Sequence, residues 1–100
     1  MPKAVRYHKQ GGPEVLQFDE IQVGDPGPGQ ARVRHKAIGV NFVDTYQRSG
    51  LYPMQLPAVA GNEGAGVVEA VGAGVTTVKA GDRVTYTGLA GSYCEVRVVP

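Results

Sequence analysis

The stretch ARVRHKAIGV, residues 31–40, is the clearest strand of this 100-residue chain. Its side chains alternate between two faces, as the period of two in an extended strand requires. One face carries Val33, His35 and Ala37, and the other carries Arg32, Arg34 and Lys36. The basic row is typical of a solvated strand face. This stretch therefore predicts a strand rather than a helix.

Further strands are expected on both sides of this one. They span residues 4–7, 15–23, 65–71, 83–87 and 93–99. The chain also holds 15 glycines and 7 prolines without a period, which favours short strands joined by tight turns over a helical bundle. A partly open β-barrel hides strand edges, so the sequence predicts a mainly β fold of six or seven short strands.

One short helix is expected directly after residue 40. Asn41 is a good N-cap, Asp44 stands at the third helical position, and Gly50 follows as a stop. Residues 41–49 are therefore predicted to be helical. Residues 51–57 contain two prolines and are expected to form an irregular loop.

Composition excludes several classes of protein. A net charge of +1 does not suggest a nucleic-acid partner. A single cysteine, Cys94, cannot form a disulfide or a thiolate metal cluster within one chain, and it fits the reducing cytosol. No apolar run reaches the roughly 20 residues that span a bilayer, and the N-terminus lacks the apolar core of a signal peptide. We therefore expect a cytoplasmic protein without a membrane or nucleic-acid partner.

The glycine-rich stretch GNEGAG, residues 61–66, does not match a dinucleotide-binding motif. Its glycines follow the order G-x-x-G-x-G before a strand, whereas the fingerprint is G-x-G-x-x-G before a helix. We interpret these glycines as structural residues that permit bulges and close backbone approach.

The stretch AIGVNFVDTYQRSGLY, residues 37–52, resembles the medium-chain dehydrogenase/reductase superfamily. Within it, the chain is most similar to the zinc-free bacterial NADPH:quinone oxidoreductases related to ζ-crystallin. Residues 8–16, 61–68 and 78–84 agree with the same family in the same order. The resemblance implies that residues 1–100 form a GroES-like N-terminal catalytic domain, the start of a longer enzyme. A Rossmann domain would follow and is absent from these residues.

The resemblance also implies a chemistry without zinc. In the zinc enzymes of the superfamily a cysteine stands at the position of Asn41 and a histidine at that of Asn62, and neutral amides are poor zinc ligands. The four-cysteine structural lobe is missing after residue 87. His8 and His35 are interpreted as structural, and Cys94 as a small buried residue.

The resemblance places Asn41, Phe42, Asp44, Thr45 and Tyr46 beside the nicotinamide. The amide of Asn41 would face the cofactor or the substrate oxygen, and it could equally serve as a helix cap. Asp44 could instead be a charge that the helix dipole stabilises. For Phe42 and Thr45 the rival interpretation is core packing.

The resemblance also makes Asn41, Tyr46 and Tyr52 the candidate catalytic residues. Each phenol would offer a proton donor and a flat face to a quinone. The alternative for both tyrosines is a partly buried side chain with a satisfied hydroxyl.

The expected function is hydride transfer from NADPH to a quinone, in a cleft shared with the missing domain. The chain would be inactive alone, and the full-length enzyme would be a homodimer. One alternative is a zinc-free reductase of enones or enoyl thioesters. Another is a stand-alone barrel without enzymatic activity.

Overall fold

The computed structural model describes residues 2–100, which form seven strands, one α-helix and one 3₁₀ turn. The strands are β1 (Lys3–Tyr7), β2 (Leu16–Glu20), β3 (Ala31–Ile38), β4 (Ala58–Val59), β5 (Glu63–Val71), β6 (Arg83–Thr87) and β7 (Val96–Val99). The 3₁₀ turn is η1 (Pro13–Val15) and the helix is α1 (Phe42–Ser49). The mainly β composition with one short helix is confirmed.

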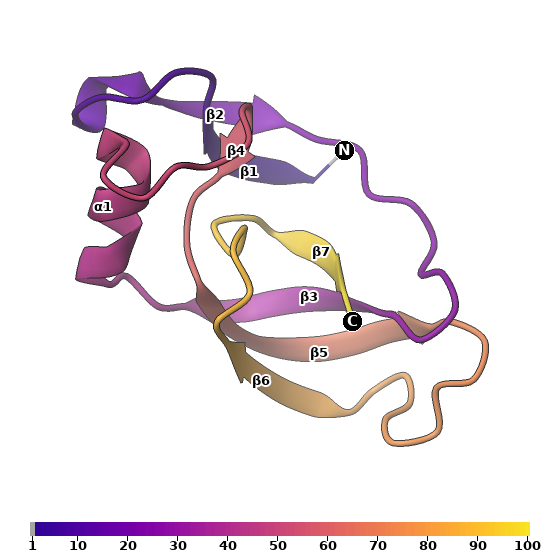
Figure 1. The fold of residues 1–100 in the computed structure, drawn as a ribbon. Helices are drawn as coiled ribbons and strands as arrows, with labels where there is room; N and C mark the ends of the chain where they lie inside the picture. The colour runs from indigo at the N-terminus through magenta and orange to yellow at the C-terminus, as the bar shows by residue number, and fades with distance from the viewer. Residues whose placement is uncertain (1) are drawn as a thin grey trace.

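The strands form two antiparallel sheets that face each other (Figure 1). One sheet has the order β2-β1-β4 and the other β6-β5-β3-β7. Residues 92–95, which we call the strap, join them. The amide of Val5 donates to the carbonyl of Tyr93 at 2.8 Å, and the amide of His35 donates to the carbonyl of Glu95 at 2.8 Å. The two sheets with this seam make the partly open barrel that the sequence predicts.

The long strand β3 is the centre of the larger sheet, between β5 and β7. Val33 is 1% exposed and packs with Ala31, Val68 and Val99. The predicted alternation ends at a register shift between His35 and Ala37, and Ala37 is exposed as a result.

The glycine-rich stretch has the structural role that we expected. A Cβ on Gly66 would lie 2.1 Å from the carbonyl oxygen of Arg34, which is closer than real contacts allow. A Cβ on Gly61 would lie 2.2 Å from Oγ of Ser92, and Gly61 has a φ of +97°. The backbone therefore approaches its neighbours too closely at both positions for any side chain.

Two predicted strands begin at the wrong residue. Residues 13–15 form η1, because the amide of Val15 bonds the carbonyl of Gly12 at 3.1 Å, so the second strand begins at Leu16. The last strand begins at Val96 rather than at residue 93, because the strap crosses from one sheet to the other before it.

Other strand ends also differ from the prediction. The strand β2 stops at Glu20, which pairs with Lys3, the first residue of β1. The strand β3 ends at Ile38, two residues early, and β5 begins at Glu63, two residues early. The short strand β4 was not predicted, because two residues between a loop and a glycine carry no periodic signal.

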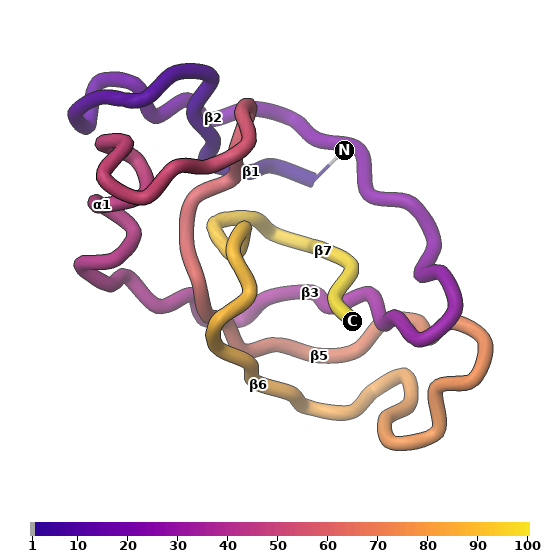
Figure 2. The backbone as a smooth tube through the Cα atoms, viewed as in Figure 1, coloured from indigo at the N-terminus to yellow at the C-terminus, as the bar shows by residue number. Residues whose placement is uncertain are grey.

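One end of the barrel carries loops and the other carries the helix. Figure 2 shows the loops of residues 21–30 and 72–82 side by side at the end away from α1, and the amide of Gly72 bonds the carbonyl of Gln30 there at 2.8 Å. The other end carries α1 over a small core of Tyr7, Val15, Ala58 and Ala60. Within the described residues, α1 and η1 are both far too short to cross a bilayer.

Candidate functional site

The helix α1 is turned with its polar side inwards. Asp44 is its buried residue at 6% exposure, whereas Phe42 is 82% exposed and Tyr46 is 41% exposed. A surface helix normally packs its apolar stripe on the core and turns charged residues to water. The reversal means that the tertiary structure holds α1 through hydrogen bonds and leaves its aromatic side uncovered.

The carboxylate of Asp44 is the centre of the inward side. Its Oδ2 accepts hydrogen bonds from the backbone amide of Asn41 at 3.0 Å and from the hydroxyl of Tyr93 at 2.7 Å. Its Oδ1 accepts a hydrogen bond from Nδ2 of Asn62. Both oxygens are therefore occupied by donors from three separate segments of the chain.

Two further contacts anchor the same side of the helix. The side-chain amides of Gln47 and Asn62 bond each other reciprocally, at 2.9 Å from Asn62 to Gln47 and 3.3 Å in return. Nε of Arg48 donates to the carbonyl of Gly11 at 3.2 Å, and the amide of Gly11 donates to the carbonyl of Arg48 at 3.0 Å. These bonds fix α1 against the start of β5 and against the loop after β1.

The buried charge of Asp44 affects the phenols around it. Burial, the hydrogen bond to Asp44 and its negative charge together raise the pKa of Tyr93 to about 12. Burial and, less strongly, the charge of Asp44 raise the pKa of Tyr7. Ionising either phenol would place a second negative charge beside the carboxylate, so both stay neutral at physiological pH.

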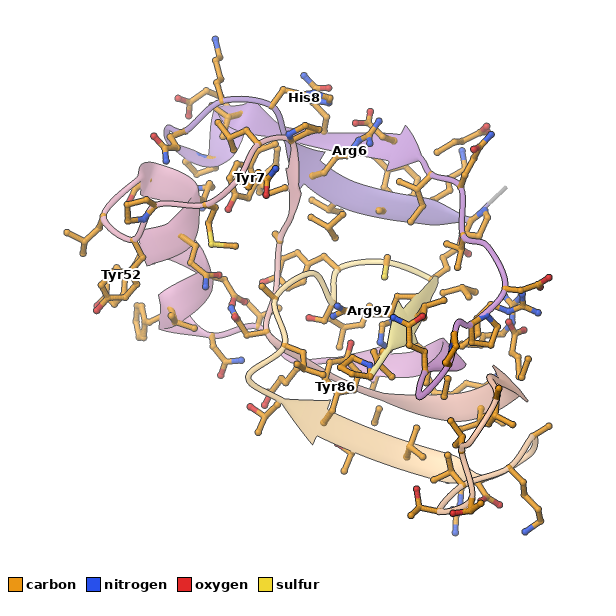
Figure 3. The ribbon with its side chains drawn as sticks, turned by 45° about the vertical axis from the view of Figure 1, so that its right-hand side comes forward. Arg6, Tyr7, His8, Tyr52, Tyr86 and Arg97 are labelled. Atoms are coloured by element: carbon orange, nitrogen blue, oxygen red, sulfur yellow. The ribbon has the colours of Figure 1, made fainter. Side chains whose placement is uncertain are left out.

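The outward side of α1 continues into the loop after it. Gly50 ends the helix in the left-handed region with a φ of +94°, and the chain turns back so that the amide of Tyr52 bonds the carbonyl of Tyr46 at 3.2 Å. The two tyrosine rings then meet edge to face, with centroids 5.7 Å apart at 81°. Figure 3 shows Tyr52 projecting away from both sheets at the α1 end of the molecule.

We define the outer aromatic face as Phe42, Tyr46 and Tyr52. Tyr52 is 50% exposed, and the face is flanked by exposed Val40 and Leu51. Large contiguous apolar patches are rare on soluble proteins, so this cluster is a candidate binding surface. Asn41 is exposed at the head of the helix, so an amide lies next to these aromatic rings.

The predicted site residues fall into two groups. One group lies at the α1 end of the barrel and consists of Asn41, Phe42, Thr45, Tyr46 and Tyr52. The hydroxyl of Thr45 donates a hydrogen bond to the carbonyl of Phe42 at 2.6 Å. Asp44 points the other way. Asn41 is confirmed as the N-cap of the helix, with Asp44 at the third position.

Sequence reasoning missed Gln47, Arg48 and Tyr93 on the inward side. Gln47 follows Asp44 by three positions, a spacing that places the two on one side of a helix, so this signal was present. Tyr93 lies 49 positions from its partner Asp44, and no local pattern could connect the two.

A second polar cluster lies on one face of the larger sheet. His35 lies between the carbonyl of Cys94, 2.8 Å from its Nδ1, and the hydroxyl of Tyr86, 2.7 Å from its Nε2. Arg97 donates to the hydroxyl of Tyr86 at 3.3 Å, and Figure 3 shows Tyr86 and Arg97 close together, far from Tyr52. Burial lowers the pKa of His35, and the charge of Arg97 lowers it further.

These contacts confirm His35 as a structural histidine. Cys94 is confirmed as a small buried residue at 5% exposure, and burial raises the pKa of its thiol. In the part of the chain that the structure describes, no three His, Cys, Asp or Glu side chains gather in a metal-binding arrangement.

The outer aromatic face fits one side of a flat, partly polar ring. Its aromatic planes can stack on such a ring, and the neighbouring amide of Asn41 can bond its polar edge. The surface is open, because Phe42, Tyr46 and Tyr52 are all exposed to solvent. An apolar groove of about 440 Å³ lies between β1 and β3, and Val40 lines it whereas none of residues 41–52 does.

Comparisons with known proteins agree on one family. The model of the alcohol dehydrogenase GroES-like domain matches residues 27–100. In sequence, the chain is 54% identical to a quinone oxidoreductase of Pseudomonas aeruginosa, over 99% of the chain and 31% of that protein. It is 48% identical to a 2-haloacrylate reductase of Burkholderia sp, over 100% of the chain and 32% of that protein.

A solved structure has the same fold. The crystal structure of an Escherichia coli quinone oxidoreductase complexed with NADPH matches with a TM-score of 0.94 and 49% identity, over 97% of the chain and 30% of that one. The chain spans about a third of the length of the curated relatives that it matches.

Proposed function

Because the chain belongs to the family of alcohol dehydrogenase GroES-like domains, we propose that it forms one wall of the active site of an NADPH-dependent quinone reductase. The observation that carries the proposal is the reversed helix α1, which leaves Phe42 82% exposed and Tyr46 41% exposed. A second domain would form the opposite wall, since the relatives are about three times as long as this chain. The chain is then the N-terminal catalytic domain of a longer enzyme.

The residues present suit a hydride transfer. NADPH supplies a hydride when it is bound, and quinones are acceptors that need little electrophilic help. Asn41 would orient the cofactor or the substrate through its side-chain amide. Phe42 and Tyr46 would exclude water from one side of the reacting rings. The phenols of Tyr46 and Tyr52 would donate hydrogen bonds to the quinone oxygen as negative charge develops there.

We propose further that the reaction needs no zinc. The amide of Asn62, at the position of a zinc ligand in related dehydrogenases, is committed to Asp44 and Gln47. Asn41 is likewise an amide, and neutral amides are weak ligands for zinc. Metal analysis of the purified full-length protein, with activity measured before and after treatment with a chelator, tests this part. Loss of activity that zinc restores would contradict it.

Substitutions on the outer aromatic face test the proposal directly. In the full-length gene product, Tyr52→Phe should raise the KM for several quinones or lower kcat, because the hydrogen bond to the quinone oxygen is lost. The matched control is Phe18→Ala, since Phe18 is also an exposed aromatic residue, at 70% exposure, but lies on β2. Unchanged steady-state kinetics in Tyr52→Phe would remove this residue from the site.

One observation favours a second candidate function. The 48% identity to a 2-haloacrylate reductase supports reduction of an activated carbon–carbon double bond, with the same wall and the same cofactor. A panel of quinones, enones, enoyl thioesters and haloacrylates separates the two. A kcat/KM that is highest for a non-quinone substrate would replace the first proposal by this one.

A further inference from the structure

We propose that Asn62 and Tyr93 are positioning residues, which act through the carboxylate of Asp44 to fix the direction of Asn41. The inference rests on the proposed function in so far as Asn41 contacts the cofactor or the substrate. It assigns to Asp44 an anchoring role in place of the cofactor contact that the family resemblance suggested.

The first step is the burial of Asp44. Its side chain is 6% exposed on the inward side of α1, whereas the outer aromatic face lies on the opposite side. Its two oxygens accept three hydrogen bonds from Asn41, Asn62 and Tyr93. A ligand on the outward side cannot reach this carboxylate without breaking the anchor of the helix.

The second step is the bond between Asp44 and Asn41. The backbone amide of Asn41 donates to Oδ2 of Asp44 at 3.0 Å, and the backbone amide of Asp44 donates to the backbone carbonyl of Asn41 at 3.1 Å. The first bond ties the backbone N–H of Asn41 to the carboxylate and the second ties its carbonyl to the first turn of α1, so the backbone of Asn41 is held on both sides. The direction in which the side chain of Asn41 leaves the helix is set with that backbone.

The third step is what holds the carboxylate itself. Asn62 lies just before β5 and Tyr93 lies in the strap, so two segments distant in sequence converge on Asp44. Tyr93 has little freedom, because a Cβ on Gly61 would lie 2.3 Å from its ring. Both donors are neutral side chains, and both residues belong to the barrel rather than to α1.

The experiment compares two phenol-removing variants in the full-length gene product. Tyr93→Phe removes the hydroxyl that bonds Asp44. Tyr7→Phe is the matched control, since Tyr7 is buried near the same charge but belongs to β1. We expect Tyr93→Phe to lower kcat by about tenfold while KM changes less than about twofold, because misplacement of a contact group weakens the transition state more than the ground state.

A second readout does not depend on catalysis. Hydrogen exchange at the backbone amide of Asn41 should accelerate in Tyr93→Phe and stay unchanged in Tyr7→Phe. Faster exchange with an unchanged kcat would overturn the proposal, because Tyr93 would then stabilise the helix without positioning a reacting group. If the unmodified full-length protein reduces no substrate, the proposed function fails. In that case, equal rates of hydrogen exchange at the backbone amide of Asn41 in Tyr93→Phe and Tyr7→Phe would overturn the positioning role as well.

The variant Asn62→Asp adds a pH-dependent test. Two carboxylates would face each other, with Tyr93, Tyr7 and Arg48 as the other ionisable groups nearby. The introduced carboxyl group can donate to Asp44 when it is protonated, as the amide does, whereas its ionised form repels Asp44. We therefore expect kcat of this variant to recover as the pH falls, with an apparent pKa that the unmodified enzyme lacks. A pH profile identical to that of the unmodified enzyme would count against the role of Asn62.

Discussion

The two sides of α1 are held in opposite ways. The inward side is polar and saturated with hydrogen bonds, from Asp44 to Tyr93 and Asn62 and from Gln47 to Asn62. The outward side is aromatic and bare, with Phe42 and Tyr46 exposed. The difference teaches that hydrogen bonds, rather than burial of its aromatic side chains, hold this helix in place.

The largest effect is expected on the inward side. Asp44→Ala removes the acceptor of three hydrogen bonds, and we expect it to lower the free energy of unfolding by about 3 kcal/mol, because buried donors lose their partners. Chemical denaturation followed by circular dichroism measures this. Asp44→Asn should cost less, since it keeps the shape and one acceptor. A loss below about 1 kcal/mol in Asp44→Ala would mean that the inward side does not hold the helix.

A smaller loss is expected from Gly61→Ala, next to the anchor. The added methyl group would overlap Ser92 and Tyr93, at a φ of +97°, and we expect a loss of about 2 kcal/mol. Gly74→Ala is the matched control, since Gly74 has a φ of +80° but open space around it. Its loss should be about 1 kcal/mol, from the backbone alone. Equal losses in the two variants would show that the close approach of the strap to Gly61 carries no energy.

The pH dependence of the free energy of unfolding tests the inward side of α1 without removing a buried side chain. The pKa of Tyr93 is raised to about 12 in the folded chain, above its ordinary value of 10.0. The stabilisation that follows is complete below pH 10 and is lost as the pH rises from 10 towards 12, because the unfolded chain releases this proton first. Tyr93→Phe should reduce this alkaline loss. Urea denaturation between pH 9 and 11.5, at about half-unit steps, decides it.

The smallest effect on stability is expected on the outward side. Phe42→Ser should change the free energy of unfolding by less than about 0.5 kcal/mol, because the side chain is 82% exposed. The same variant should weaken NADPH binding in the full-length gene product, measured by fluorescence titration. A loss of stability above about 1 kcal/mol would make Phe42 part of the core and remove the contrast between the two sides.

The sequence predicts the main course of the fold. Alternation in residues 31–40 identifies β3, and the Asn41 cap with the Gly50 stop identifies α1. Both signals are local, because each depends on residues within one turn or one strand. The ends of β2 and β7 were misplaced because the partner strand or the strap decides them, and neither is visible in the local pattern.

The site was predictable in its outward half. Phe42 and Tyr46 are four residues apart and Tyr52 follows a glycine stop, so their common location could be inferred. The inward half depends on contacts such as that between Asp44 and Tyr93, which lie 49 positions apart. A carboxylate at the third helical position has a local explanation as a cap, and that explanation hid its second role.

The strap has a consequence for synthesis on the ribosome. Residues 92–95 bond Lys3 and Val5 in β1, His35 in β3 and Ala60 after β4, so this one segment joins the two sheets. Strand pairs such as β1 with β2 can form while the chain is emerging, but the seam between the sheets cannot close before Glu95 has left the exit tunnel. Since Tyr93 belongs to the same segment, the helix that carries the outer aromatic face receives the hydrogen bond from Tyr93 to Asp44 only after this segment has emerged.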